Sequence, residues 1–123
     1  MTPTIHNITI YAGSYFSLPV QWMTGEPAVG VNLTGCAVKM QIRKTATSTD
    51  VLYELSTSNG KITFVDATIG KFQVTITGEE SENFTFFRGD YDLEVHYPVG
   101  SPVDCVRLMQ GSVTIDPNVT RGV

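Results

Sequence analysis

Residues 36–43 read Cys-Ala-Val-Lys-Met-Gln-Ile-Arg, an alternation that places every second side chain on one face of an extended chain. One face collects Cys36, Val38, Met40 and Ile42, and the other carries Lys39, Gln41 and Arg43. A period of two over a whole segment is typical of a strand in an antiparallel sheet, with one face buried and the other in water. We therefore predict such a strand at residues 36–43.

The same pattern recurs along most of the chain. Residues 91–97 read Tyr-Asp-Leu-Glu-Val-His-Tyr, which again separates apolar from polar side chains. Comparable strands are predicted at residues 5–11, 15–22, 51–55, 61–65, 71–77 and 105–115. About eight short strands, separated by turn residues, predict an all-β fold: an antiparallel β-sandwich that forms a single domain over residues 1–123.

Composition limits the classes of partner. The chain has 123 residues, of which 41% are hydrophobic and 16% charged, and this is enough for one core without metal or disulfide. Its net charge is −4 and its eight Lys and Arg residues are scattered, whereas nucleic-acid binding requires a row of basic side chains. No run approaches the roughly 20 apolar residues of a membrane span. We expect neither nucleic acid nor a membrane as a partner.

Two local signals refine the strands. Pro19 cannot donate a ladder hydrogen bond, so strand 15–22 is predicted to lie at a sheet edge or to carry a bulge. In the last strand, the apolar residues before Gln110 have the opposite parity to those after Gly111. Because parity determines which face is buried, a one-residue β-bulge is predicted at Gln110–Gly111.

Glycines are predicted to shape the turns. Ser58-Asn59-Gly60 can supply the positive φ angles of a tight turn, which predicts a hairpin between strands 51–55 and 61–65. Gly35 and Gly89 are predicted to start the strands that follow them, and Gly111 to sit at the bulge. The core is expected to contain Trp22, Met40, Phe72, Tyr91 and Leu93.

One segment predicts a helix. Thr77 followed by Glu79, Glu80 and Glu82 places a capping side chain and acidic residues at the positive end of a helix dipole. We predict one short helical turn near residues 78–86.

The sequence predicts no catalytic, cofactor-binding or metal-binding residue. Neither histidine, His6 or His96, belongs to a recognisable motif, and His96 is interpreted as a solvent-facing residue beside Glu94 and Asp92. A calcium site at Asp90, Asp92 and Glu94 is disfavoured, because same-face carboxylates on a straight strand are spaced by about 7 Å. An enzyme that uses a carboxylate pair, either Glu79 with Glu82 or Asp90 with Asp92, is the hypothesis that ranks last.

The N-terminal sequence bears on the compartment, and through it on the state of the two cysteines. Residues 1–6 lack the basic and apolar regions of a signal peptide, so synthesis and folding in a cytoplasm are expected. Cys36 and Cys105 both fall in predicted strands. Two buried free thiols are the favoured interpretation, and a bridge between them remains open at this point.

Three segments resemble small structural proteins of tailed bacteriophages and prophages. They are residues 13–22 with the following Leu33-Thr34-Gly35 and strand 36–43, residues 59–64 with 70–76, and residues 89–95 with 107–115 and 119–121. Their order is similar to that of immunoglobulin-like or upper-baseplate N-terminal β-sandwich domains of phage tails. The resemblance implies an immunoglobulin-like sandwich without catalytic residues.

The function that the resemblance implies is structural. It points to a virion protein of the tail, collar or baseplate, made in the bacterial host cytoplasm, that forms a homo-oligomer and docks to other tail, collar or baseplate proteins. The segment Ile5–Tyr11, which has few charges, is a candidate for strand addition to a neighbour, and the tail 116–123 for contact with an adjacent subunit.

The alternative function is a carbohydrate- or cell-surface-binding module. It requires outward aromatic side chains gathered on one patch, for which Tyr11, Tyr15, Tyr53 and Tyr97 are the candidates.

Overall fold

The structure, a computed structural model, describes residues 2–121. This part of the chain forms an all-β fold with eleven strands, of which three contain only two residues. The remaining eight strands agree with the predicted number. Short helical segments occur at η1 (Ala67–Ile69) and α1 (Gly78–Glu82), and no helix within residues 2–121 has the length and apolar character needed to cross a membrane.

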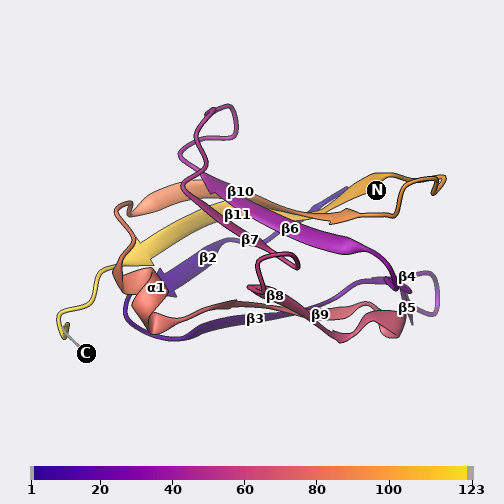
Figure 1. The fold of residues 1–123 in the computed structure, drawn as a ribbon, viewed down its shortest axis with the longest axis horizontal. Coiled ribbons are helices and arrows are strands. Elements are labelled where there is room, and N and C mark those ends of the chain that lie inside the picture. The colour runs from indigo at the N-terminus through magenta and orange to yellow at the C-terminus, as the bar shows by residue number, and fades with distance from the viewer. Residues whose placement is uncertain (1, 122–123) are drawn as a thin grey trace.

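The strands form two main sheets and a small ribbon (Figure 1). The larger sheet, which we call sheet A, has the order β1 (Thr4–Ile5) and β2 (Ile8–Tyr11), β11 (Cys105–Asp116), β10 (Arg88–His96), β6 (Ala37–Arg43), β7 (Tyr53–Ser56). Sheet B has the order β3 (Phe16–Gln21), β9 (Lys71–Ile76), β8 (Ile62–Asp66). The ribbon pairs β4 (Met23–Thr24) with β5 (Val29–Gly30).

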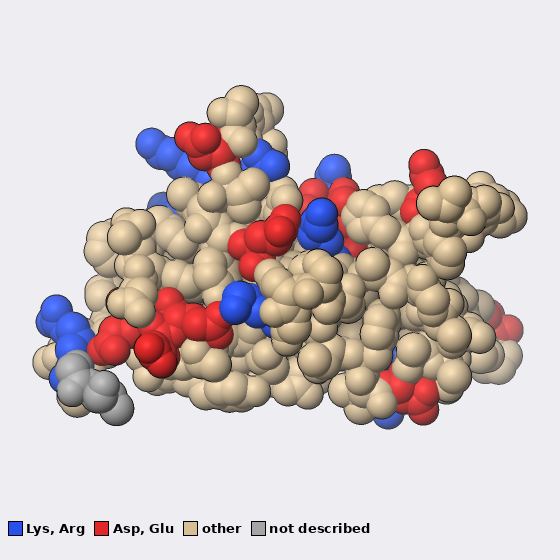
Figure 2. All heavy atoms as spheres, viewed as in Figure 1, with Lys and Arg blue, Asp and Glu red and all other residues tan. Residues whose placement is uncertain are grey.

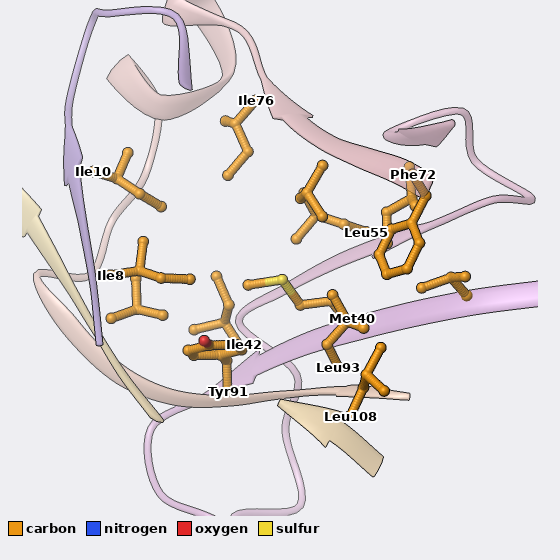
Figure 3. Packing of buried hydrophobic residues seen from close by; sticks show 14 of the residues in the cluster. Ile8, Ile10, Met40, Ile42, Leu55, Phe72, Ile76, Tyr91, Leu93 and Leu108 are labelled. Atoms are coloured by element: carbon orange, nitrogen blue, oxygen red, sulfur yellow. The ribbon is translucent and has the colours of Figure 1, made fainter. Parts of the chain in front are cut away.

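Sheets A and B face each other across one hydrophobic core (Figure 1). In Figure 3, Phe72 and Ile76 from β9 extend toward the layer that contains Met40 and Leu93 from sheet A. All five predicted core residues are buried, since Trp22, Met40, Phe72, Tyr91 and Leu93 expose 8% or less of their surface. The alternation seen in the sequence therefore identifies the buried face correctly.

The predicted edge strand and the predicted helix are confirmed. β3 pairs only with β9, and Pro19 is exposed on it. In α1 the Thr77 side chain accepts from the Glu80 N–H, and the Glu80 side chain accepts from the Thr77 N–H, which completes a capping box. The helix ends at Glu82, earlier than residue 86.

The predicted hairpin between residues 51–55 and 61–65 is wrong. β7 pairs with β6 in sheet A, whereas β8 pairs with β9 in sheet B. The intervening segment carries the chain from one sheet to the other, and Gly60 is its residue with positive φ (80°). Alternation shows which face of a strand is buried but not which strand pairs with it. The turn residues Ser58-Asn59-Gly60 therefore suggested a hairpin between two strands that belong to different sheets.

The bulge in the last strand exists, but it lies earlier than predicted. Leu93 pairs with Met109 and Glu94 pairs with Arg107, so Leu108 is the extra residue. Gly111 pairs regularly with Tyr91. The change of parity in the sequence requires one extra residue between the apolar residues Leu108 and Val113. The pairing with β10 determines at which residue this bulge occurs.

Two of the four glycines that were predicted to shape turns or the bulge lie inside strands. Gly35 and Gly60 have positive φ, but Gly89 belongs to β10 and Gly111 to β11. A Cβ atom on Gly89 would lie 2.7 Å from the Arg43 carbonyl oxygen, and one on Gly111 would lie 2.4 Å from that of His6. Close approach of another backbone, not a turn, requires glycine at these positions.

The predicted first strand is interrupted. β1 and β2 both run parallel to β11, with a break at His6–Asn7. At the break the Tyr91 hydroxyl donates to the His6 carbonyl oxygen at 2.5 Å, and the Asn7 Oδ1 accepts from the Ser112 N–H at 3.1 Å. Burial raises the pKa of the Tyr91 hydroxyl to about 12, so it remains a donor at neutral pH.

Candidate interaction surface

The outer face of sheet A is polar and hollowed. An open hollow of about 610 Å³ lies against β6, β10 and β11 and is bordered by Ala46 and Ser48. Both belong to the loop 44–50, which projects beyond the end of β6 in Figure 1. The polar lining of the hollow is Gln41, Arg43, Ser48, Asp90, Asp92, Glu94, Arg107 and Gln110. Strand alternation brings these side chains together, except for Ser48 on the loop, since the opposite face of the same strands is buried in the core.

Arg43 attaches the loop to the hollow. Its guanidinium donates to the carbonyl oxygens of Ser48 at 2.8 Å and Thr49 at 2.9 Å, and to the Gln41 side chain at 2.9 Å. Arg107 lies across the hollow, with its Nε 3.4 Å from Asp92 Oδ2. Desolvation and the charge of Glu94 raise the pKa of the Asp92 carboxyl, against the opposing effect of Arg107 and Arg43. The hollow therefore contains paired charges of both signs.

Charge on the face shown in Figure 2 is mixed as well. Figure 2 shows Lys and Arg distributed over several elements and interleaved with Asp and Glu, with an acidic group over α1. This face offers no continuous basic surface for a phosphate backbone.

At the end of β10, three side chains with different donor atoms meet. Glu94 and His96 lie on the outer face of β10, and Cys105 lies opposite His96 on β11. His96 Nε2 is 3.2 Å from Glu94 Oε1 and 3.9 Å from Cys105 Sγ. Desolvation is the main cause that raises the pKa of the Cys105 thiol, with a further contribution from Glu94. Sequence reasoning placed Glu94 beside His96 but missed Cys105, because no pattern in the sequence reveals the register between two strands.

The two cysteines are free and lie on opposite faces of sheet A. His96 pairs with both Ala37 and Cys105, so Ala37 and Cys105 share the outer face. Cys36 precedes Ala37 and packs against the core instead. Both thiols are half-buried rather than fully buried, and their positions on opposite faces are incompatible with a disulfide.

An aromatic groove of about 350 Å³ lies between β7 and α1. Tyr53 and Phe84 make an edge-to-face contact at 4.6 Å, and Phe84 stacks on Phe86 at 5.0 Å. Lys61 and Tyr53 both hydrogen-bond to the Glu80 carboxylate at the rim of the groove. Desolvation alone would raise the pKa of Glu80, but the hydrogen bonds from Lys61, Tyr53 and Thr77 outweigh it and lower that pKa to about 2. The sequence suggested only a helix-dipole role for this carboxylate.

The tyrosines proposed for a sugar-binding patch do not gather. Tyr11 lies on β2 and Tyr53 on β7, at opposite edges of sheet A. Tyr97 follows the end of β10 and packs against the core, whereas Tyr15 is exposed beside β3. The alternative of a carbohydrate-binding module therefore has no common platform of these four side chains.

The edge of β2 is the least protected edge of sheet A. β2 pairs with β11 and with no other strand within residues 2–121. The N–H groups of His6 and Ala12 donate to β11, at Gln110 O and Asp116 O, both at 2.9 Å. Because N–H groups alternate between the two sides of a strand, those of Thr9 and Tyr11 point away from the sheet.

The segment after β11 contacts α1 through Asn118. Asn118 Nδ2 donates to Glu82 Oε1 at 3.2 Å. Residues 122 and 123 of the predicted subunit-contacting tail lie outside the described residues.

Comparison of the chain with known protein families and with curated proteins finds no match. The functional proposal therefore depends on the molecule's own geometry and on the resemblance noted in its sequence.

Proposed function

We propose that the chain is a non-enzymatic structural protein of a phage virion, a tail, collar or baseplate component that self-assembles and docks to other virion proteins. The free edge of β2 is the observation that carries the proposal. It presents four uncharged residues, Ile8 to Tyr11, without a proline or a lysine to block pairing. An unprotected edge of this kind is a template for strand addition from a neighbouring subunit.

The strand order supports an immunoglobulin-like assignment of the fold. In that fold one sheet contains strands A, B, E and D, and the other contains G, F and C, which the variable type extends with C′. The order β3-β9-β8 corresponds to B-E-D, and the order β11-β10-β6-β7 to G-F-C-C′. Sandwiches of this kind serve many unrelated functions, so the assignment of a virion role depends on the resemblance in the sequence and on the free edge.

A single substitution tests the edge. Thr9 is exposed, and its N–H points away from β11, so Thr9→Pro removes an outward donor without removing a bond to β11. Truncation of residues 1–11 is unsuitable, because Ile8 and Ile10 belong to the core. Thr9→Val retains the N–H and serves as the matched control.

Light scattering over a range of concentrations provides the measurement. We expect a closed oligomer for the wild type and for Thr9→Val, and a smaller mass for Thr9→Pro with an unchanged melting temperature. A wild type that stays monomeric at every concentration, or a Thr9→Pro oligomer of the same mass, would contradict self-assembly through β2.

The virion role has a separate test. Particles purified from the host that encodes this chain are digested and analysed by mass spectrometry. Several copies of the chain per particle are expected, and particles that lack the chain would overturn the assignment to a virion.

A further inference from the structure

The end of the β10–β11 hairpin brings three metal-binding side chains into reach of one ion. One oxygen of Glu94, one nitrogen of His96 and the sulfur of Cys105 all lie within 4.8 Å of one another. Around a tetrahedral zinc ion, donor atoms are separated by about 3.5 Å, as follows from the usual Zn–N, Zn–O and Zn–S distances. The Glu94–His96 separation of 3.2 Å and the His96–Cys105 separation of 3.9 Å bracket this value.

The backbone register holds these side chains close together. The Tyr97 N–H donates to the Asp104 carbonyl oxygen at 2.9 Å, which makes Tyr97 and Asp104 a hydrogen-bonded pair. The adjacent pair of His96 and Cys105 is therefore of the non-hydrogen-bonded type, in which opposing side chains are closest. Glu94 lies two residues before His96 on the same strand face.

The three side chains contact one another, since His96 Nε2 lies 3.2 Å from Glu94 Oε1 and 3.9 Å from Cys105 Sγ. The nearby cations are already engaged, since Arg107 pairs with Asp92 at 3.4 Å and Lys39 lies 4.0 Å from Glu54. The acidic surroundings of the thiol would attract a divalent cation.

We propose that Glu94, His96 and Cys105 bind one zinc ion, with the fourth position open to a water molecule. Sulfur and imidazole donors select zinc over calcium or magnesium, which prefer oxygen ligands. The side chains of His96 and Glu94 are 42% and 30% exposed, so an ion at this position is accessible from solvent. The ion would clamp the end of the hairpin, where residues 97–104 connect β10 to β11.

Cobalt(II) provides the probe, because a thiolate ligand gives a charge-transfer absorption in the near ultraviolet. Reduced, chelator-treated full-length protein is titrated with Co²⁺, and Zn²⁺ is then added to displace it. We expect one Co²⁺ per chain, a charge-transfer band, loss of that band on addition of Zn²⁺, and a higher melting temperature with Zn²⁺ than without it.

The chain offers matched controls. It contains one other cysteine and one other histidine, Cys36 and His6. Cys105→Ser should abolish the band, and His96→Gln and Glu94→Gln should each weaken Zn²⁺ binding at least about tenfold. Cys36→Ser and His6→Gln should change neither property.

Three results would overturn the proposal. They are a wild type that binds no Co²⁺ or Zn²⁺, a charge-transfer band that survives Cys105→Ser, and Zn²⁺ affinity that is unchanged in both His96→Gln and Glu94→Gln. The melting temperature of each variant without metal shows whether the fold is intact. A Cys105→Ser variant that fails to fold leaves the His96→Gln and Glu94→Gln titrations as the deciding measurement.

Discussion

The two edges of sheet A differ in how their backbone groups are satisfied. At β7 the side chain of Asn59 covers the edge: its Oδ1 accepts from the Ser56 N–H at 2.9 Å, and its Nδ2 donates to the Glu54 carbonyl oxygen at 3.0 Å. At β2 the outward N–H groups of Thr9 and Tyr11 have no such cover among the described residues. One edge is closed by the protein's own side chain, and the other is available to a second molecule.

The two edges also differ in how they are attached. β7 is held by antiparallel pairing to β6 and by its contacts with the aromatic groove. β2 depends on parallel pairing with β11 and on the close approach of His6 to Gly111. We expect a substitution that crowds the backbone near β2 to destabilise the β2 edge. At the β7 edge, we expect loss of side-chain hydrogen bonds to have the destabilising effect.

Gly111→Val should have the largest effect. Its Cβ would lie 2.4 Å from the His6 carbonyl oxygen and 2.9 Å from Asn7 Oδ1, so the N-terminal segment must move away from β11. We expect a loss of about 3 kcal/mol in the free energy of unfolding, measured by urea denaturation. Hydrogen exchange should show faster exchange of the Ile8 and Ile10 amides.

Gly60→Val is the control for this substitution. Nothing lies within 4 Å of a Cβ at Gly60, so only the positive φ opposes valine, at a cost of about 1–2 kcal/mol. Equal losses for the two variants would show that crowding at His6 does not hold the β2 edge in place.

Asn59→Ala should open the β7 edge. The substitution removes the side-chain bonds to Ser56, Glu54 and Lys61, and we expect a loss of about 2 kcal/mol together with increased self-association at high concentration. Asn59→Asp retains an acceptor for the Ser56 and Lys61 N–H groups and should lose less. Light scattering that shows no added association in Asn59→Ala would mean that Asn59 does not guard this edge.

Glu80→Gln should have the smallest effect and one that depends on pH. The pKa of the Glu80 carboxyl is about 2 in the folded protein, against an ordinary value of 4.5 for a glutamate. Its carboxylate therefore stabilises the folded state above pH 4.5 and loses that contribution as the pH falls toward 2. We expect about 1–2 kcal/mol at neutral pH, a figure reduced for the partial exposure of the Lys61–Glu80 pair.

Urea denaturation between neutral pH and pH 2 measures this effect. The difference between wild type and Glu80→Gln should shrink as the pH falls below 4.5. Glu79→Gln, in the same turn of α1, makes a suitable control because the Glu79 side chain forms no hydrogen bond to the described residues. A difference that stays constant with pH would contradict the assigned role of the Glu80 carboxylate.

Much of the local structure was predictable from residue order. Alternation identified the buried faces of β6 and β10, Pro19 marked an edge strand, and Thr77 with Glu80 marked the start of α1. These features depend on contacts within a few residues, or on the simple division of a strand into a wet face and a dry face.

The candidate sites were much less predictable. Cys105 is near Glu94 and His96 only because β11 pairs with β10. Asn59 can hydrogen-bond to the outer edge of β7 only because that edge is left unpaired in the sheet. Gly111 was predicted to sit at a β-bulge, but its role is to allow close approach of the His6 backbone from the other end of the chain.

The division between these two kinds of feature has a physical cause. Side-chain type carries hydrophobicity, which is enough to specify which residues are extended and which of their faces is buried. Strands pair through backbone N–H and C=O groups, which nearly all residues have. The order of side chains in one strand therefore does not identify the strand that pairs with it. Packing of the whole core selects the partner, and with it the open edge at β2, the closed edge at β7 and the meeting of Glu94, His96 and Cys105.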